Sequence, residues 1–279
     1  MDNCVTYIKL LKWIIVFNVI SLQVYSQGGK YDLGARSAGL ATASVTISDS
    51  WSMFNNIAGI TEVDGPTSAL SYQNRFSVSA LNTMGAAFIQ PTSFGHLGIS
   101  LFRFGDELFN EQKIGFAFAD EIGIVSLGFG VNYLQINIEG VGRRAILPIE
   151  FGGIATLHEK FVIGAHITNI NQAKVSRTNN ERLPTIMKMG LSYRPLSNLM
   201  MNVELEKDLD FEEVFKAAFE YNFVKQFYAR TGFRTAPFIA TFGLGFDSSK
   251  FLVDYAYSND SRIGDIHELS VVYQFRRSP

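Results

Sequence analysis

The sequence predicts an all-β protein, a 14-stranded antiparallel transmembrane β-barrel with a short N-terminal plug or hatch segment. Three observations support this prediction. The chain has 279 residues, 47% of them hydrophobic, including 24 Phe and 11 Tyr beside 24 Gly. After residue 26, no apolar run reaches the roughly 18 residues that a membrane-spanning helix needs. Apolar and polar residues instead alternate in segments of strand length.

The composition excludes several classes of protein. A formal net charge of −2 argues against a strongly basic nucleic-acid binder. The high apolar content argues against a disordered chain. The single cysteine excludes a disulfide framework and a multi-cysteine zinc site. A globular β-protein remains, or a membrane protein that crosses the bilayer with strands.

Residues 1–26 have the pattern of a secretory signal peptide. Two lysines precede an apolar stretch at 13–24, and Val24 and Ser26 stand at positions −3 and −1 of a cut near Ser26. A buried N-terminal strand is the alternative interpretation. The only cysteine, Cys4, lies within this segment and leaves with it. The mature chain is therefore expected to be exported.

Residues 67–279 contain fourteen segments with strand-like alternation, separated by turn residues. Most have the length that a tilted strand needs to cross a bilayer. With an even number of strands, the chain enters the first strand and leaves the last strand on the same side of the membrane. The expected spans are 67–76, 81–91, 96–105, 111–120, 125–139, 144–157, 161–172, 184–194, 199–208, 212–223, 227–235, 237–247, 250–259 and 265–275.

The segment at 251–258 shows the alternation most clearly. Phe251, Val253, Tyr255 and Tyr257 share one face, and Asp254 lies on the other. A secreted β-sandwich would also alternate in this way. Strands in such proteins are about 5 to 6 residues long, however, and these segments are longer. The connections also alternate between short and long, as in outer-membrane barrels, so the sequence favours a barrel in the bacterial outer membrane.

Two irregularities are expected in the wall. In the fifth segment, the apolar residues change from odd to even positions after Tyr133, which predicts a β-bulge there. Pro148 lies inside the sixth segment, where it cannot donate a ladder hydrogen bond. A local break or bulge is therefore expected at Pro148.

If the aromatic face meets lipid, a set of charged residues must face the lumen. Because isolated charges in a narrow lumen are costly, we expect these residues to pair across neighbouring strands. Structural pairing is one interpretation of this network, and a polar route for a solute is the other. The set comprises Lys188, Glu204, Glu206, Lys216, Glu220, Arg230, Arg234, Asp254 and Glu268.

The N-terminal segment, 27–66, is the candidate to occupy the lumen. It contains a run of small residues at 34–44, followed by Asp49, a possible helix cap, and by Trp51 and Phe54. Glycines on the inward face of the wall would leave room for it. The segment either fills the lumen or caps it from outside.

The same segment resembles a known family. The runs 33–41, 43–45, 49–51 and 54–60 look like the N-terminal signature of the PorV/PorQ group, within the wider FadL-like outer-membrane barrels. Ile57 stands where the family pattern has proline. The residues that carry this hatch motif are Gly34, Ala35, Arg36, Gly39, Asn55, Asn56, Ala58 and Gly59.

The resemblance implies a fourteen-stranded barrel with one of two roles. The leading hypothesis is an accessory or component of type IX protein secretion that contacts secretion-system or surface proteins. The alternative is a FadL-like channel that takes up hydrophobic small molecules. The alternative predicts an apolar pocket between the N-terminal segment and the wall, with a lateral opening near Pro148.

No enzymatic activity is expected. The chain lacks the common hydrolase, nucleotide-binding and metalloprotease motifs, and its four histidines are scattered. His166 shares the inner face with Gly164 and is expected to be a hydrogen-bonded lumen residue. The expected partners are outer-membrane lipid and either secretion proteins or a hydrophobic ligand, with no cofactor, metal or nucleic acid.

Overall fold

The computed structural model describes residues 30–175, 182–248, 250–260 and 263–275. The signal peptide predicted at 1–26 lies outside these residues. Within them, no helix is both long enough and apolar enough to cross a membrane. Residues from Tyr31 onward form one compact unit.

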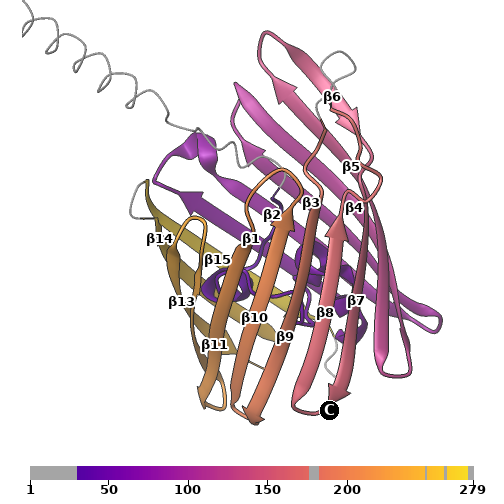
Figure 1. Cartoon of the computed structure of the whole chain (residues 1–279), viewed down its shortest axis with the longest axis vertical. Helices are drawn as coiled ribbons and strands as arrows, with labels where there is room; N and C mark the ends of the chain where they lie inside the picture. The colour runs from indigo at the N-terminus through magenta and orange to yellow at the C-terminus, as the bar shows by residue number, and fades with distance from the viewer. Residues whose placement is uncertain (1–29, 176–181, 249, 261–262, 276–279) are drawn as a thin grey trace, which may run out of the picture. The chain divides into compact units, whose positions relative to one another are not determined.

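The wall is a closed barrel of fourteen antiparallel strands, as predicted (Figure 1). Each strand pairs with its sequence neighbours, β1 closes the barrel on β15, and β6 is an extra strand paired only with β5. The strands are β1 Thr67–Arg75, β2 Thr83–Thr92, β3 Gly95–Gly105, β4 Phe109–Ile122, β5 Val125–Ile138, β6 Gly142–Ile146, β7 Ile149–His158, β8 Phe161–Thr168, β9 Ile186–Leu196, β10 Leu199–Asp208, β11 Val214–Val224, β12 Phe227–Arg234, β13 Ile239–Asp247, β14 Phe251–Asp260 and β15 Gly264–Gln274.

The two ends of the barrel differ in their connections. The turns at 93–94, 123–124, 159–160, 197–198 and 225–226 define one end, which we call the turn rim. Gly123 supplies the positive φ (67°) that one of these tight turns requires. The longer connections, 76–82, 169–185 and 209–213 among them, define the other end, the loop rim.

Alternation along the strands separates the two faces of the wall, because successive side chains of a strand point to opposite sides. On β13, Phe242 and Leu244 are exposed, whereas Thr241 is buried. On β11, Phe215 and Phe219 are exposed and Lys216 is fully buried. The apolar residues therefore form the outward face, and polar side chains occupy the interior.

The predicted irregularity at Pro148 is confirmed. The sixth predicted segment is divided into β6 and β7, and both parts pair with β5. The register is the same on both sides of the interruption, from Leu134↔Ile146 to Val131↔Ile149. The proline therefore interrupts the ladder without shifting it.

The β-bulge expected near Tyr133 is wrong. β4 and β5 pair in one unbroken register from Phe109↔Ile138 to Ile122↔Val125. Leu134 points inward and is fully buried. The apolar residues of β5 therefore change from the outward to the inward face without an extra residue, and Leu134 lies opposite the buried Lys113 of β4.

Residues 31–66 form the plug, which lies inside the barrel (Figure 1). The plug contains the short helices α2 (Ala35–Gly39) and α3 (Ser52–Asn55) and the 3-10 helix η1 (Ile57–Glu62). Helix α2 contacts β12–β15, whereas α3 and η1 lie against β3–β5 and β7. A further 3-10 helix, η2 (Ser79–Leu81), belongs to the loop rim.

Candidate functional site

The plug is a loop that folds back on itself. Leu33 and Asn55 are joined by two hydrogen bonds, because the Asn55 amide donates to the Leu33 carbonyl (3.0 Å) and accepts from its N–H (3.3 Å). Arg36 forms an ion pair with Asp49 at 3.2 Å. These contacts hold the first and second halves of the plug together without a long helix or strand.

Gly34 occupies a position that only glycine fits. Its φ is 103°, and a Cβ built on it would lie 2.6 Å from Cδ2 of the Trp51 indole. Its N–H donates to Oε1 of Glu268 on β15 at 2.7 Å. The neighbouring N–H of Ala35 donates to the Ser270 hydroxyl at 3.1 Å. The start of the hatch motif is thus attached to the wall through its backbone.

Asn56 connects the second half of the plug to the opposite wall. It is fully buried, and its amide nitrogen donates to the Val45 carbonyl at 2.6 Å and to the carbonyls of Gly153 and Ala165 at 3.3 Å each. Its amide oxygen accepts from the Ala58 N–H at 3.3 Å, which caps η1. The cap is supplied here by the asparagine before Ile57, so proline at 57 is not required for the turn.

Glycines on the inward face of the wall provide the space that the plug occupies. A Cβ on Gly128 would lie 2.6 Å from the Ala58 nitrogen, and one on Gly243 would lie 3.0 Å from Cα of Gly39. These distances are shorter than ordinary van der Waals contacts. Cβ atoms at several other wall glycines would also crowd plug atoms: Gly85, Gly98, Gly152, Gly164, Gly190 and Gly232.

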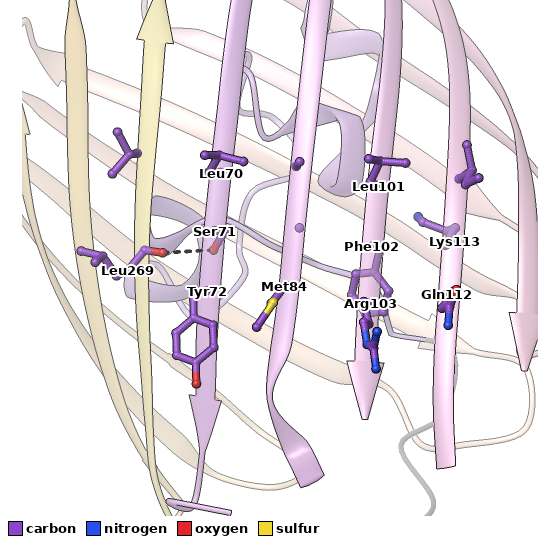
Figure 2. Close-up of a pocket in the computed structure, with 14 residues that line it drawn as sticks. Leu70, Ser71, Tyr72, Met84, Leu101, Phe102, Arg103, Gln112, Lys113 and Leu269 are labelled. Atoms are coloured by element: carbon purple, nitrogen blue, oxygen red, sulfur yellow. Dashed lines mark hydrogen bonds between the residues drawn. The ribbon is translucent and has the colours of Figure 1, made fainter. Parts of the chain in front are cut away.

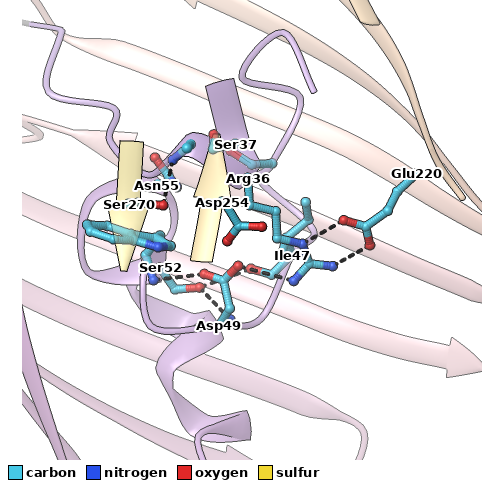
Figure 3. Close-up of polar contacts among 12 residues, drawn as sticks. Arg36, Ser37, Ile47, Asp49, Ser52, Asn55, Glu220, Asp254 and Ser270 are labelled. Carbon is cyan, nitrogen blue, oxygen red and sulfur yellow. Dashed lines mark hydrogen bonds and ion pairs between the residues drawn. The ribbon is translucent and has the colours of Figure 1, made fainter. Parts of the chain in front are cut away.

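One group of charges surrounds Arg36 (Figure 3). Its guanidinium forms two hydrogen bonds to Glu220 on β11, at 2.9 and 2.7 Å, in addition to the pair with Asp49. Glu220 also accepts from Nε of Arg230 at 2.6 Å, and Arg230 continues to Asp254 at 2.6 Å. The network therefore joins two plug residues, Arg36 and Asp49, to three wall residues, and each of its charged groups has a partner of opposite charge.

A second group lies beside Lys216. Its ammonium forms ion pairs with Glu204 and Glu206 at 2.7 Å each, and donates to the Thr42 carbonyl at 3.2 Å. Glu204 accepts in turn from the Val45 N–H at 2.8 Å. Such buried pairs are costly to break, because removal of one partner leaves an uncompensated charge.

The structure also places the other charges predicted for the lumen. Lys188 is buried and forms an ion pair with Asp32 of the plug. Glu268 accepts hydrogen bonds from Ser71 and Gln73 at 2.8 Å each, as well as from the plug. Arg234 is half-buried on the same strand as Arg230, four residues nearer the loop rim.

Sequence reasoning missed part of the polar interior. Glu150 accepts a hydrogen bond from Asn132 at 2.7 Å, and both side chains are buried. His166, which was predicted to face the lumen, is buried there with its Nε2 3.2 Å from the Glu150 carboxylate. Lys113 is also buried, with its ammonium 4.9 Å from the centroid of the Tyr31 ring. Asn132, Glu150 and Lys113 occupy the same alternate positions along their strands as glycines and alanines that face inward. That alternation was the signal that could have identified them.

The plug meets β1–β4 mainly through apolar contacts, and no ion pair joins the two in the described residues, although the Lys113 ammonium of β4 lies over the Tyr31 and Phe54 rings of the plug. We call this region the apolar side, and the inward face of β9–β15 the charged side. On the apolar side, all side chains of one cluster are buried and pack as in a protein core. From the plug they are Leu33, Trp51, Met53, Phe54, Ile57, Ile60 and Val63, and from the wall Ala69, Ala87, Ile89, Phe102, Ala117, Ala119 and Val272.

The break at Pro148 lies next to a segment of the loop rim. The Asn171 amide donates to the Leu147 carbonyl at 2.9 Å and accepts from the Ile149 N–H at 3.0 Å. Ile170 also donates its N–H to the Ile149 carbonyl at 2.9 Å. One exposed side chain therefore bridges the two ends of the interrupted strand.

The chemistry of the interior is that of packing and ion pairing. Among the described residues, no group of three or more His, Cys, Asp or Glu is arranged to hold a metal ion. The carboxylates named above are paired with cations or accept hydrogen bonds from the plug and wall. Such an arrangement can hold a movable segment in place, and it can exclude water from the lumen.

No family model matches the chain, and none of the curated proteins matches it by sequence. Its fold does match solved structures. It superposes on the toluene transporter TbuX of Ralstonia pickettii with a TM-score of 0.68 and 12% identity, covering 89% of this chain and 100% of that chain.

Two further channels are similar. The CymD monoaromatic hydrocarbon channel gives a TM-score of 0.67 at 11% identity, covering 89% of this chain and 99% of that chain. The Pseudomonas putida toluene transporter TodX gives 0.62 at 10% identity, covering 87% and 98%. The chain thus has the FadL-like barrel fold, whereas its assignment to the PorV/PorQ group stays a prediction.

Proposed function

We propose that this chain is an outer-membrane channel for small hydrophobic molecules. The observation that carries the proposal is the apolar side, where the plug meets β1–β4 without charged pairs in a barrel whose fold resembles that of hydrocarbon channels. An apolar solute moving between plug and wall would desolvate no ion pair there. The secretion role, which we expected to be the leading one, becomes the second candidate.

The uptake hypothesis predicts an apolar pocket between the plug and the wall, and the interior differs in this respect. In place of an empty apolar pocket between plug and wall, the apolar side is a packed cluster. Passage therefore requires the second half of the plug to move, while the ion pair of Arg36 with Glu220 and the hydrogen bond from Lys216 to the Thr42 carbonyl hold the first half. The break at Pro148, bridged by Asn171, is our candidate for a lateral opening.

The test is uptake of radiolabelled toluene by intact cells of a host that lacks a hydrocarbon channel. Expression of the chain should raise the initial rate above that of cells carrying an empty vector. Because the only native cysteine is Cys4, Leu147→Cys combined with Asn171→Cys permits a short thiol cross-linker across the break. Cross-linking should lower uptake, and each single variant treated identically is the control. Uptake equal to that of the empty vector would refute the proposal.

The second candidate is an accessory role in type IX secretion, which the N-terminal signature favours. The structure explains the signature residues as contacts of the plug with the wall, so they serve either function. Co-purification in mild detergent tests this candidate. A barrel recovered alone, from cells whose protein secretion is unchanged after deletion of the chain, would exclude it.

A further inference from the structure

A hollow lies on the outward face of the wall, across β15 and β1–β4 (Figure 2). Its volume is about 590 Å3. Most of its outward-facing lining is apolar and exposed, with Leu70 at 63% and Met84 at 52% of full exposure. The residues that line it from the outward face are Leu70, Tyr72, Met84, Ala86, Leu101, Arg103, Gln112, Ile114, Leu269 and Val271.

Ala86 accounts for the depth of the hollow. In the register of the sheet it stands between Leu70 on β1 and Leu101 on β3. Outward positions elsewhere on the wall are mostly filled by larger apolar side chains. A methyl group between two leucines leaves a groove with apolar walls, which an acyl chain could occupy.

Arg103 is the exposed cation at one end of this groove, whereas Lys113, which also lines it, is buried and lies against the plug. The Arg103 side chain forms no hydrogen bond or ion pair within the part of the chain that the structure describes. In register it lies between Met84 and Gln112. An unpaired guanidinium on a lipid-facing wall is unfavourable at the centre of a bilayer and tolerated near its surface.

The position of Arg103 on β3 matches the bilayer surface. It is two residues from Gly105, where the strand ends at the loop rim. In Figure 2, the side chains of Arg103 and Tyr72 extend toward the ends of β3 and β1. Long basic side chains reach toward the headgroups in this manner while their stems stay in the apolar layer.

We propose that this groove binds a membrane lipid with a phosphate headgroup. The Arg103 guanidinium contacts the phosphate, for which its planar set of donors is suited, and one acyl chain lies over Ala86 between Leu70 and Leu101. The proposal goes beyond transport. It requires the barrel to be in a membrane and is independent of what the lumen carries.

The test is lipid retention by the full chain in mild detergent, measured by native mass spectrometry. The probes are phosphatidic acid and a diacylglycerol with the same acyl chains. The wild type should retain phosphatidic acid about tenfold better, the ratio expected for one charge-assisted contact. Arg103→Gln should abolish this preference and leave diacylglycerol retention unchanged. Ala86→Leu should reduce retention of both lipids.

Arg144→Gln is the matched control, because Arg144 is exposed on β6 and lies outside the groove. It should retain both lipids as the wild type does. Equal retention of the two lipids by the wild type, or an unchanged preference in Arg103→Gln, would overturn the proposal. If Ala86→Leu lowers toluene uptake but leaves phosphatidic acid retention unchanged, the groove belongs to the transport route and the lipid proposal is wrong. Resistance of the folded barrel to sodium dodecyl sulfate verifies that each variant is folded.

Discussion

The charged side and the apolar side of the lumen hold the same plug by different physical means. On the charged side, Arg36 and the Val45 N–H reach carboxylates of β10 and β11, and Asp32 reaches Lys188 of β9. On the apolar side, α3 and η1 pack against alanines and Phe102. Ion pairs need fixed geometry, whereas apolar contacts are non-directional and tolerate sliding. We therefore propose that the first half of the plug is the anchor. The second half, whose wall contacts are mainly apolar apart from the Asn56 and Thr61 hydrogen bonds, is proposed as the part that moves.

The largest expected effect is at Lys216. Lys216→Met leaves Glu204 and Glu206 buried without their cation, and should lower the free energy of unfolding by about 4 kcal/mol. Urea titration in detergent micelles measures this loss. Adding Glu204→Gln and Glu206→Gln should restore most of it, because the neutral side chains carry no charge to compensate. A single variant as stable as the wild type would contradict the anchor assignment.

A smaller loss is expected on the apolar side. Met53 is buried and contacts Gly98 of β3, and Met53→Ala should lower the free energy of unfolding by about 3 kcal/mol. Hydrogen exchange should accelerate at 52–62 and stay slow at 35–45, because the anchor is untouched. Met187→Ala, on the outward face of β9, is the control. Equal acceleration in both parts of the plug would show that they move as one unit.

Adjacent glycines on β7 provide a finer comparison. A Cβ on Gly152 would overlap the Asn56 side chain and lie 3.1 Å from the Ala58 nitrogen, whereas a Cβ on Gly153 would lie 3.6 Å from its nearest neighbour. Gly152→Ala should therefore destabilise the barrel by about 2 kcal/mol through overpacking. Gly153→Ala should stay within about 0.5 kcal/mol of the wild type. Thermal unfolding compares the two, and equal midpoints would argue against close packing of η1 on the wall.

The smallest effect is expected outside the lumen. Lys207 and Glu213 form an ion pair at 2.9 Å near the loop rim, where both side chains are at least one-third exposed. Lys207→Met should leave the urea midpoint close to that of the wild type, because water and salt screen an exposed pair. The same urea titration measures the midpoint. A loss comparable to that of Lys216→Met would mean that burial does not distinguish the two pairs.

Much of the wall could be predicted from the sequence, because period-2 alternation and turn residues are local signals. The segment expected at 199–208 coincides with β10, and most other ends differ by a few residues. The break at Pro148 follows from the missing N–H of proline. The bulge predicted at Tyr133 was wrong because Leu134 is an apolar side chain that faces the interior, and the sequence alone does not distinguish an apolar residue that faces lipid from one that faces inward.

The interior was less predictable. The alternation of side chains along β10 and β11 placed Lys216 and Glu204 on the inward face. A charge that faces a narrow lumen requires a partner of opposite charge. Which partner it takes depends on strand register and on the path of the plug, both of which join residues far apart in sequence. Arg36 and Glu220 are separated by 184 positions, and no local pattern relates them.

Local chemistry in the chain therefore specifies strands, turns, faces and the small residues of the plug. The tertiary structure decides that the plug lies in the lumen, that its ion pairs with the wall are on β9–β15 and its largest apolar cluster is on β1–β4, and that a groove with Arg103 at its end opens on the outward face. The physical reason is that alternation is a property of a few neighbouring residues, whereas packing and ion pairing depend on closure of the whole barrel.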